Sequence, residues 1–161
     1  MIGFLEWIEH TGIATWVRES PSLLAYTLVL SLHAIGLSIV VGISSIVGLR
    51  IVGAFRDIPL EPMFKLFPLM YIGFWINAVS GLLLLMANAT GMFTMIMFWL
   101  KMFFVICAIL TLGVVRKCFT DGTLTTKAVP LAWALLGFWF CAIVTGRLVS
   151  YRYLIEAWFG I

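Results

Sequence analysis

The stretch that decides the fold is residues 23–49, LLAYTLVLSLHAIGLSIVVGISSIVGL, which contains no Asp, Glu, Lys or Arg. A transmembrane helix needs about 20 consecutive, mainly apolar residues. The pair Ser20-Pro21 just before the stretch is a helix-start signal, with Ser as N-cap and Pro in the first turn, and Arg50 follows its end. The stretch therefore predicts a membrane span.

Three more apolar stretches follow this one. They are residues 67–87, 93–115 and 129–149. Polar segments separate them, at residues 53–68, 88–91 and 118–127. Four spans with short connections use up a chain of 161 residues, so we expect a single transmembrane domain over residues 1–161. The predicted fold class is all-α, an integral membrane four-helix bundle.

The composition narrows the class of protein. Apolar residues make up 63% of the chain and charged residues only 11%, whereas a soluble domain carries about 25% charged residues. We therefore expect the lipid bilayer to surround most of the surface. The net charge is +3, and the basic residues are scattered among apolar segments. A nucleic-acid-binding protein would have a basic face or stripe, so this class is not favoured. The three cysteines show no CxxC spacing, so neither a disulfide nor a thiolate metal site is predicted.

The N-terminal segment has a pattern of its own. It carries Glu6, Glu9 and His10 where a cleaved signal peptide would have a basic region, so we expect it to stay in the mature chain. Apolar and polar residues alternate over residues 3–17 in a way that is typical of an amphipathic helix lying in the membrane interface, with a break at Thr11-Gly12.

The cations predict the orientation of the spans. The connection after the first span and the connection after the third are basic, while residues 88–91 carry no charge. The positive-inside rule therefore places both basic loops in the cytoplasm and both termini outside. Cations on the other side, Arg18, Arg147 and Arg152, weaken this asymmetry.

Three ionisable residues lie inside the predicted spans: His33, Lys101 and Arg147. In hydrocarbon an ionisable side chain is costly, so it marks a functional site unless packing explains it. With the predicted orientation, all three fall in the outer half of the bilayer, and no span contains Asp or Glu. Such a set indicates snorkelling to the interface, anionic lipid headgroups or a bound anionic ligand.

His33 is too short to snorkel from its depth, which leaves two interpretations. It either forms a hydrogen bond between helices or ligates a metal or haem iron. A haem b group would join the three residues, with His33 as axial and metal ligand and with Lys101 and Arg147 pairing with the propionates. One histidine supplies one axial ligand. The second would come from a Met, from water or from His33 of another subunit, since His10 is expected at the membrane surface.

Asn77 and Ser80 lie in the middle of the second span. Ser80 is expected to bond back to its own helix, whereas Asn77 needs a partner on another helix or a ligand. Asn77 is therefore a fourth candidate cofactor-binding residue, and together with His33 it could hold a quinone.

Other residues suggest weaker alternatives. The run of Met92, Met95 and Met97 offers thioethers, which suit Cu(I), although methionine is also an ordinary filler of apolar helices. Trp75 and Trp139 are deep in their spans and would either line a flat cofactor or face lipid. No Ser-His-Asp order, glycine-rich phosphate loop or HExxH motif is present, and no catalytic residue is predicted.

Several short motifs resemble an uncharacterised bacterial family of small four-helix membrane proteins. They are LHAIG at 32–36, Gly42, LRIVG at 49–53 and GRLVSY at 146–151. The resemblance covers nearly the whole chain and implies that His33, Arg50 and Arg147 belong to the family's pattern. More loosely, the chain is similar to cytochrome b561-type and copper-resistance membrane proteins. Cytochrome b561-type proteins carry several intramembrane histidines, whereas this chain has one.

The leading expectation is a small haem b-binding or electron-transfer subunit of the bacterial cytoplasmic (inner) membrane. It would act as a homo-oligomer or as a subunit of a membrane complex. The alternatives are a subunit that binds a quinone, a small anion or a lipid without haem, and a structural subunit of a larger complex.

Overall fold

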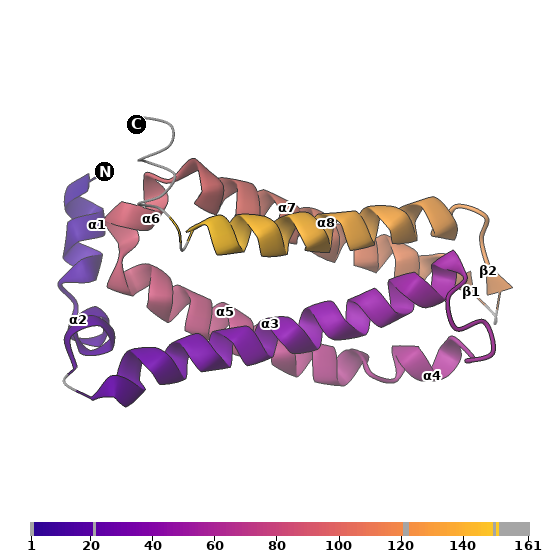
Figure 1. The fold of residues 1–161 in the computed structure, drawn as a ribbon, viewed down its shortest axis with the longest axis horizontal. Helices are drawn as coiled ribbons and strands as arrows, with labels where there is room; N and C mark the ends of the chain where they lie inside the picture. The colour runs from indigo at the N-terminus through magenta and orange to yellow at the C-terminus, as the bar shows by residue number, and fades with distance from the viewer. Residues whose placement is uncertain (1, 21, 121–122, 150, 152–161) are drawn as a thin grey trace. The chain divides into compact units, whose positions relative to one another are not determined.

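The computed structural model describes residues 2–20, 22–120, 123–149 and 151, and these residues are mostly helical (Figure 1). Among them, four helices are long and apolar enough to cross a membrane. They are α3 (Leu23–Val52), α5 (Phe67–Ala87), α7 (Ile96–Lys117) and α8 (Ala128–Val149). The prediction of an all-α protein with four spans is confirmed, and the chain is a multi-pass membrane protein by this criterion.

The ends of the spans differ in places from the predicted ones. The first helix continues past Leu49 to Val52. The third begins at Ile96 rather than at Phe93, because residues 89–93 form a separate short helix, α6 (Ala89–Phe93). The polar segment before α5 also contains a single helical turn, α4 (Glu61–Phe64), with Pro62 in its first turn, where a missing N–H has no consequence.

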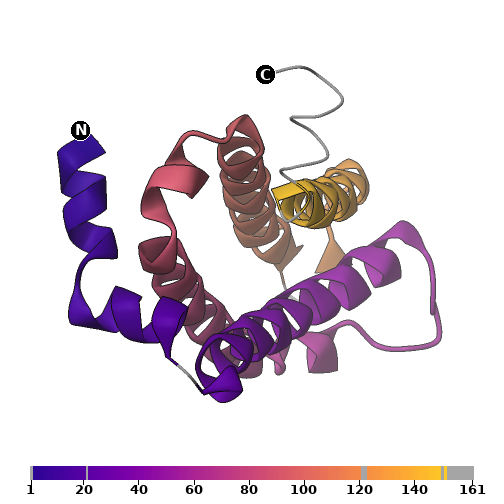
Figure 2. The ribbon, with the colours of Figure 1, turned by 60° about the vertical axis from the view of Figure 1, so that its left-hand side comes forward.

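Two short helices precede the first span, α1 (Ile2–Glu9) and α2 (Gly12–Glu19). They meet at an angle, as Figure 2 shows in indigo. The break falls where Thr11 Oγ1 donates a hydrogen bond of 2.7 Å to the Ile8 carbonyl. In α2, Ala14 and Val17 are buried, whereas the apolar side chains of Ile13 and Trp16 are exposed. The amphipathic character of this segment and its location in the membrane interface stay predictions.

The chain forms two compact units, which we describe separately. The first unit comprises residues 1–42 and 66–94. It contains α1, α2, the first part of α3, α5 and α6. Its apolar cluster joins α2, α3 and α5 through Val17, Val29, Leu84 and Ala87.

The second unit comprises residues 43–65 and 95–161. Its helices α7 and α8 lie side by side along their length (Figures 1 and 2). They are joined by a small antiparallel hairpin of β1 (Phe119–Thr120) and β2 (Thr123–Leu124), with Phe119 opposite Leu124. Small and branched side chains of this pair are fully buried: Ala108, Val115, Ala128, Ala132 and Leu135.

A well-formed cap ends α3 in the second unit. The Ala54 N–H bonds to the Leu49 carbonyl at 2.9 Å, and Gly53 takes φ +112°, which is the arrangement of a Schellman motif. The guanidinium of Arg50 then holds the following loop by donating to the carbonyls of Arg56, at 2.8 Å, and Ile58. Arg50 therefore has a structural role at this loop.

Candidate functional site

His33 and Asn77 lie together in the first unit, on α3 and α5. The His33 Nδ1 atom is 3.0 Å from the Asn77 backbone carbonyl oxygen. In return, the Asn77 side-chain amide donates a hydrogen bond of 2.8 Å to the His33 backbone carbonyl. Each side chain thus binds the backbone of the opposite helix, so the interpretation of His33 as a residue that bonds two helices is confirmed. Asn77 has the interhelical partner that its position required.

The surroundings of Nδ1 bear on which ring nitrogen carries the proton. Nδ1 lies 3.0 Å from the Asn77 carbonyl oxygen, which can only accept, and 3.3 Å from both the Asn77 side-chain nitrogen and the Ser80 hydroxyl. The shortest of these contacts favours the tautomer with the proton on Nδ1. The neutral ring then carries its lone pair on Nε2. Hydrogen bonding and ligation use different nitrogen atoms. The two interpretations of His33 are consequently compatible with each other.

Ser80 and Gly81 line the other side of the His33 ring. The Ser80 hydroxyl donates a hydrogen bond of 2.5 Å to the Ile76 carbonyl of its own helix, as predicted, and lies 3.3 Å from His33 Nδ1. A Cβ atom on Gly81 would lie 2.9 Å from His33 Cε1, closer than van der Waals contact allows. The imidazole therefore occupies space that only a glycine at this position leaves open.

Close approach of the two backbones makes these hydrogen bonds possible. A Cβ atom on Gly36 would lie 2.6 Å from the Asn77 nitrogen and 2.7 Å from the Gly73 carbonyl oxygen. A Cβ atom on Gly73 would lie 2.7 Å from the Ile39 Cγ2 atom. Small residues at such positions allow transmembrane helices to pack backbone against backbone. The glycines thereby bring His33 and Asn77 within bonding distance.

Lys101 and Arg147 belong to the second unit, on α7 and α8. The aliphatic part of Lys101 lies over Gly146, where an added Cβ would be 3.4 Å from Lys101 Cδ. Arg147 is exposed and donates to the Tyr151 hydroxyl at 3.2 Å, with its guanidinium 5.2 Å from that ring. Within the described ranges, neither cation pairs with a carboxylate. Two neighbouring helices thus carry positive groups that no anion of the described residues neutralises.

Trp139 of α8 is the most unusual polar group of the second unit. It is only 2% exposed, and its Nε1–H has no hydrogen-bond partner among the described residues. Trp75, in contrast, is 65% exposed. The idea that both tryptophans face lipid is therefore wrong for Trp139. A buried donor without an acceptor is destabilising by about 1–3 kcal/mol, so Trp139 is a candidate ligand contact.

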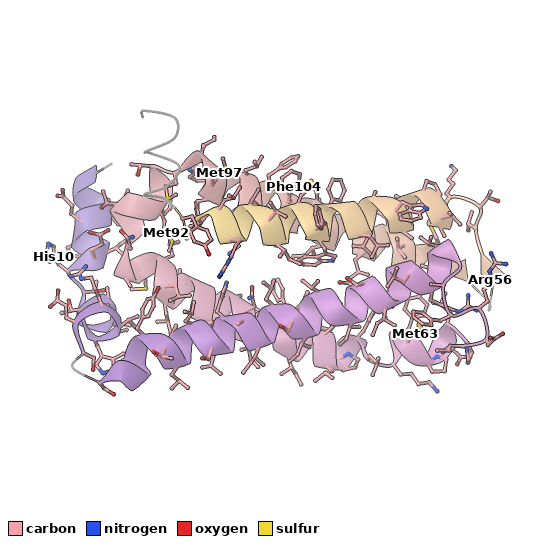
Figure 3. The ribbon with its side chains drawn as sticks, in the orientation of Figure 1. His10, Arg56, Met63, Met92, Met97 and Phe104 are labelled. Carbon is pink, nitrogen blue, oxygen red and sulfur yellow. The ribbon has the colours of Figure 1, made fainter. Side chains whose placement is uncertain are left out.

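The remaining candidates are less well supported. His10 lies exposed at the turn between α1 and α2 (Figure 3), so it gains no support as a second ligand. Met92 belongs to α6 and Met97 to α7. Within the described part of the chain, no three His, Cys, Asp or Glu side chains form a metal-binding group. A metal bound here would need a ligand from elsewhere or a group such as a porphyrin that brings its own.

Comparison of the chain with family models, with curated proteins and with solved structures finds no match. The resemblance to small four-helix bacterial membrane proteins gains no support from these comparisons and stays a prediction.

Sequence reasoning missed Gly36, Gly73 and Gly81 as determinants of the site. A usable signal was nevertheless present. Gly36 follows His33 by three residues, and Gly73, Asn77 and Gly81 are spaced by four, so each set shares one helix face.

Proposed function

We propose that this chain is a membrane-embedded haem b-binding subunit for electron transfer, with His33 as an axial ligand of the iron. The hydrogen bond from His33 Nδ1–H to the Asn77 carbonyl supports this proposal. Histidines that ligate metals almost always donate their other ring N–H to a carbonyl or carboxylate, which fixes the tautomer and the ring orientation. The haem would supply one-electron chemistry, while the protein would hold the imidazole and exclude water.

In this proposal Lys101 and Arg147 pair with the propionates, which are the anions that these two cations lack among the described residues. The second axial ligand would come from a Met, from water or from His33 of another copy, so we propose a homo-oligomer or a subunit of a larger complex. The proposed location is the bacterial inner membrane. The two basic loops would lie in the cytoplasm by the positive-inside rule, and both termini would lie outside.

The experiment is a visible absorption spectrum of protein purified from haem-replete cells, with haem quantified against protein. We expect a stoichiometric Soret band that is lost in His33→Gln. Glutamine keeps a donor for the Asn77 carbonyl, so the helix contact is retained while the imidazole is removed. The matched control is Ser38→Ala on the same helix, because the Ser38 hydroxyl only bonds back to Ala34 at 2.8 Å. Colourless wild-type protein would refute the proposal.

A second candidate is a subunit that binds a quinone, a small anion or a lipid without haem. The buried Trp139 Nε1–H, which has no partner within the described ranges, favours it, because a quinone carbonyl would satisfy that donor. Organic extraction of purified protein, followed by mass spectrometry, tests this candidate. We expect quinone to be retained by the wild type and lost from Trp139→Phe. Extracts of the two proteins with equal quinone content would exclude it.

A further inference from the structure

A pocket of about 390 Å³ lies in the first unit, where the short helices meet the ends of α3 and α5. Four of its seven lining residues are polar or charged, namely Glu9, Arg18, Tyr26 and Asn88. The others, Leu84, Ala87 and Met92, form an apolar part of the wall; Met92 is labelled in Figure 3. The pocket thus combines two opposite charges with an apolar surface.

The pocket lies beside the amphipathic helices α1 and α2. These helices expose large aromatic side chains, with Phe4, Trp7 and Trp16 each more than half exposed. Exposed tryptophans are typical of segments at the level of lipid headgroups. We therefore expect the pocket to open at headgroup depth rather than in the hydrocarbon.

Glu9 supplies the negative charge of the pocket. Its Oε1 atom accepts a hydrogen bond of 2.6 Å from the Thr90 backbone N–H, which holds the half-buried carboxylate in place. No cation of the described residues pairs with Glu9. Its position suits a ligand with an ammonium group, which would supply both the opposite charge and hydrogen-bond donors.

Arg18 supplies the positive charge. Its Nε and Nη2 atoms bind Glu19 Oε1 at 3.2 and 2.9 Å. Its Nη1 atom reaches only the Ala87 carbonyl, at the long distance of 3.5 Å. Arg18 and Glu9 do not form an ion pair with each other. A ligand that satisfies both residues must carry both signs, with an anion such as phosphate toward Arg18.

We propose that this pocket binds the headgroup of an aminophospholipid, with its primary ammonium on Glu9 and its phosphate on Arg18. The apolar wall formed by Leu84, Ala87 and Met92 would then contact the start of the acyl chains. A primary ammonium has three N–H donors, whereas the trimethylammonium of a choline lipid has none. The site should therefore prefer ethanolamine lipids over choline lipids of equal net charge.

The test uses the full chain, delipidated in detergent and titrated with mixed micelles that contain phosphatidylethanolamine, phosphatidylcholine or phosphatidylglycerol. Thermal unfolding and native mass spectrometry report the binding. We expect saturable binding of phosphatidylethanolamine, weakened about tenfold by Glu9→Gln through loss of a charge-assisted hydrogen bond. Glutamine keeps an acceptor for the Thr90 N–H. Arg18→Gln should weaken phosphatidylethanolamine and phosphatidylcholine alike.

The matched controls are Glu6→Gln and Lys65→Gln, at exposed positions outside the pocket, and they should leave binding unchanged. Equal affinity for phosphatidylethanolamine and phosphatidylcholine would overturn the proposal, as would a preference for phosphatidylglycerol. Soluble phosphoethanolamine distinguishes the source of the ligand. If phosphoethanolamine displaces the lipid only at a concentration much higher than that of the lipid, the result supports a lipid site. Tighter binding of the soluble compound would overturn the assignment to lipid.

Discussion

The α3–α5 pair of the first unit and the α7–α8 pair of the second use polar groups in opposite ways. In the first pair, His33 and Asn77 each bind the backbone of the opposite helix, at 3.0 and 2.8 Å. In the second pair, the hydroxyls of Thr111 and Thr145 bond back to their own helices, at 2.7 Å each.

The difference shows that two mainly apolar helix pairs can be held together by different interactions. The first pair uses its donors and acceptors to fix one arrangement of two backbones. The second pair is held by apolar packing, around residues such as Ala108 and Leu135. Among the described residues, the polar ends of Lys101, Arg147 and Trp139 form no hydrogen bond from one helix of this pair to the other.

The largest loss of stability is expected for a substitution at Gly36, where α3 and α5 approach each other closely. We expect Gly36→Ala to destabilise the protein by about 3 kcal/mol, because the new Cβ would overlap backbone atoms that cannot move aside. The measurement is unfolding in detergent followed by tryptophan fluorescence. The control is Gly42→Ala on the same helix, where an added Cβ meets nothing within 4 Å. Equal stability of the two variants would show that α3 and α5 are not in close contact.

The next effect concerns Arg50 of the second unit, whose guanidinium binds two backbone carbonyls. Arg50→Lys keeps the charge but loses the fork that binds the carbonyls of Arg56 and Ile58. Loss of about 1.4 kcal/mol would open the loop about tenfold more often, and trypsin should cleave after Arg56 correspondingly faster. Lys65→Arg is the control in the same connection. An unchanged cleavage rate would show that the hydrogen bonds of Arg50 do not hold this loop.

A smaller effect is expected for the hydrogen bond across the first pair. Asn77→Ala removes the bond to the His33 carbonyl and should lower the free energy of unfolding by about 1 kcal/mol, within the range measured for bonds between transmembrane helices. Ser38→Ala, which removes a bond within one helix, should have less effect. The same unfolding assay decides. A loss no larger than that of Ser38→Ala would mean that the glycine contacts alone hold the pair.

The smallest effect is expected at Trp139. Trp139→Phe removes a buried donor that has no acceptor among the described residues, which offsets part of the packing lost with the smaller ring. The stability of ligand-free protein should therefore change by less than about 1 kcal/mol. The stabilities of the wild type and Trp139→Phe are measured after exhaustive delipidation and again as purified. A large loss of stability in the delipidated protein would contradict this expectation.

Much of this architecture could be predicted from the sequence. The four spans follow from apolar stretches, since a helix in lipid must be apolar over most of its length. Asn77 was expected to need a partner, because a buried amide without one is costly. Its partner was not predictable, because hydropathy does not determine which helix faces meet.

Other features depend on the folded chain in the same way. The burial of Trp139 and the exposure of Trp75 reflect tertiary packing, which leaves no mark on the local pattern. The pocket around Glu9 and Arg18 is formed by residues from several distant segments. The expected roles of Lys101 and Arg147 as partners of an anion stay predictions.

The length of α3 has a consequence for where this protein can reside. Its 30 residues make a rod about 45 Å long, whereas the hydrocarbon core of a bilayer is about 30 Å thick. Such hydrophobic mismatch is relieved by helix tilt or by local thickening of the bilayer, at a fraction of a kcal/mol per ångström. The acyl-chain length of the host membrane sets the bilayer thickness, and it therefore helps to determine the tilt of α3.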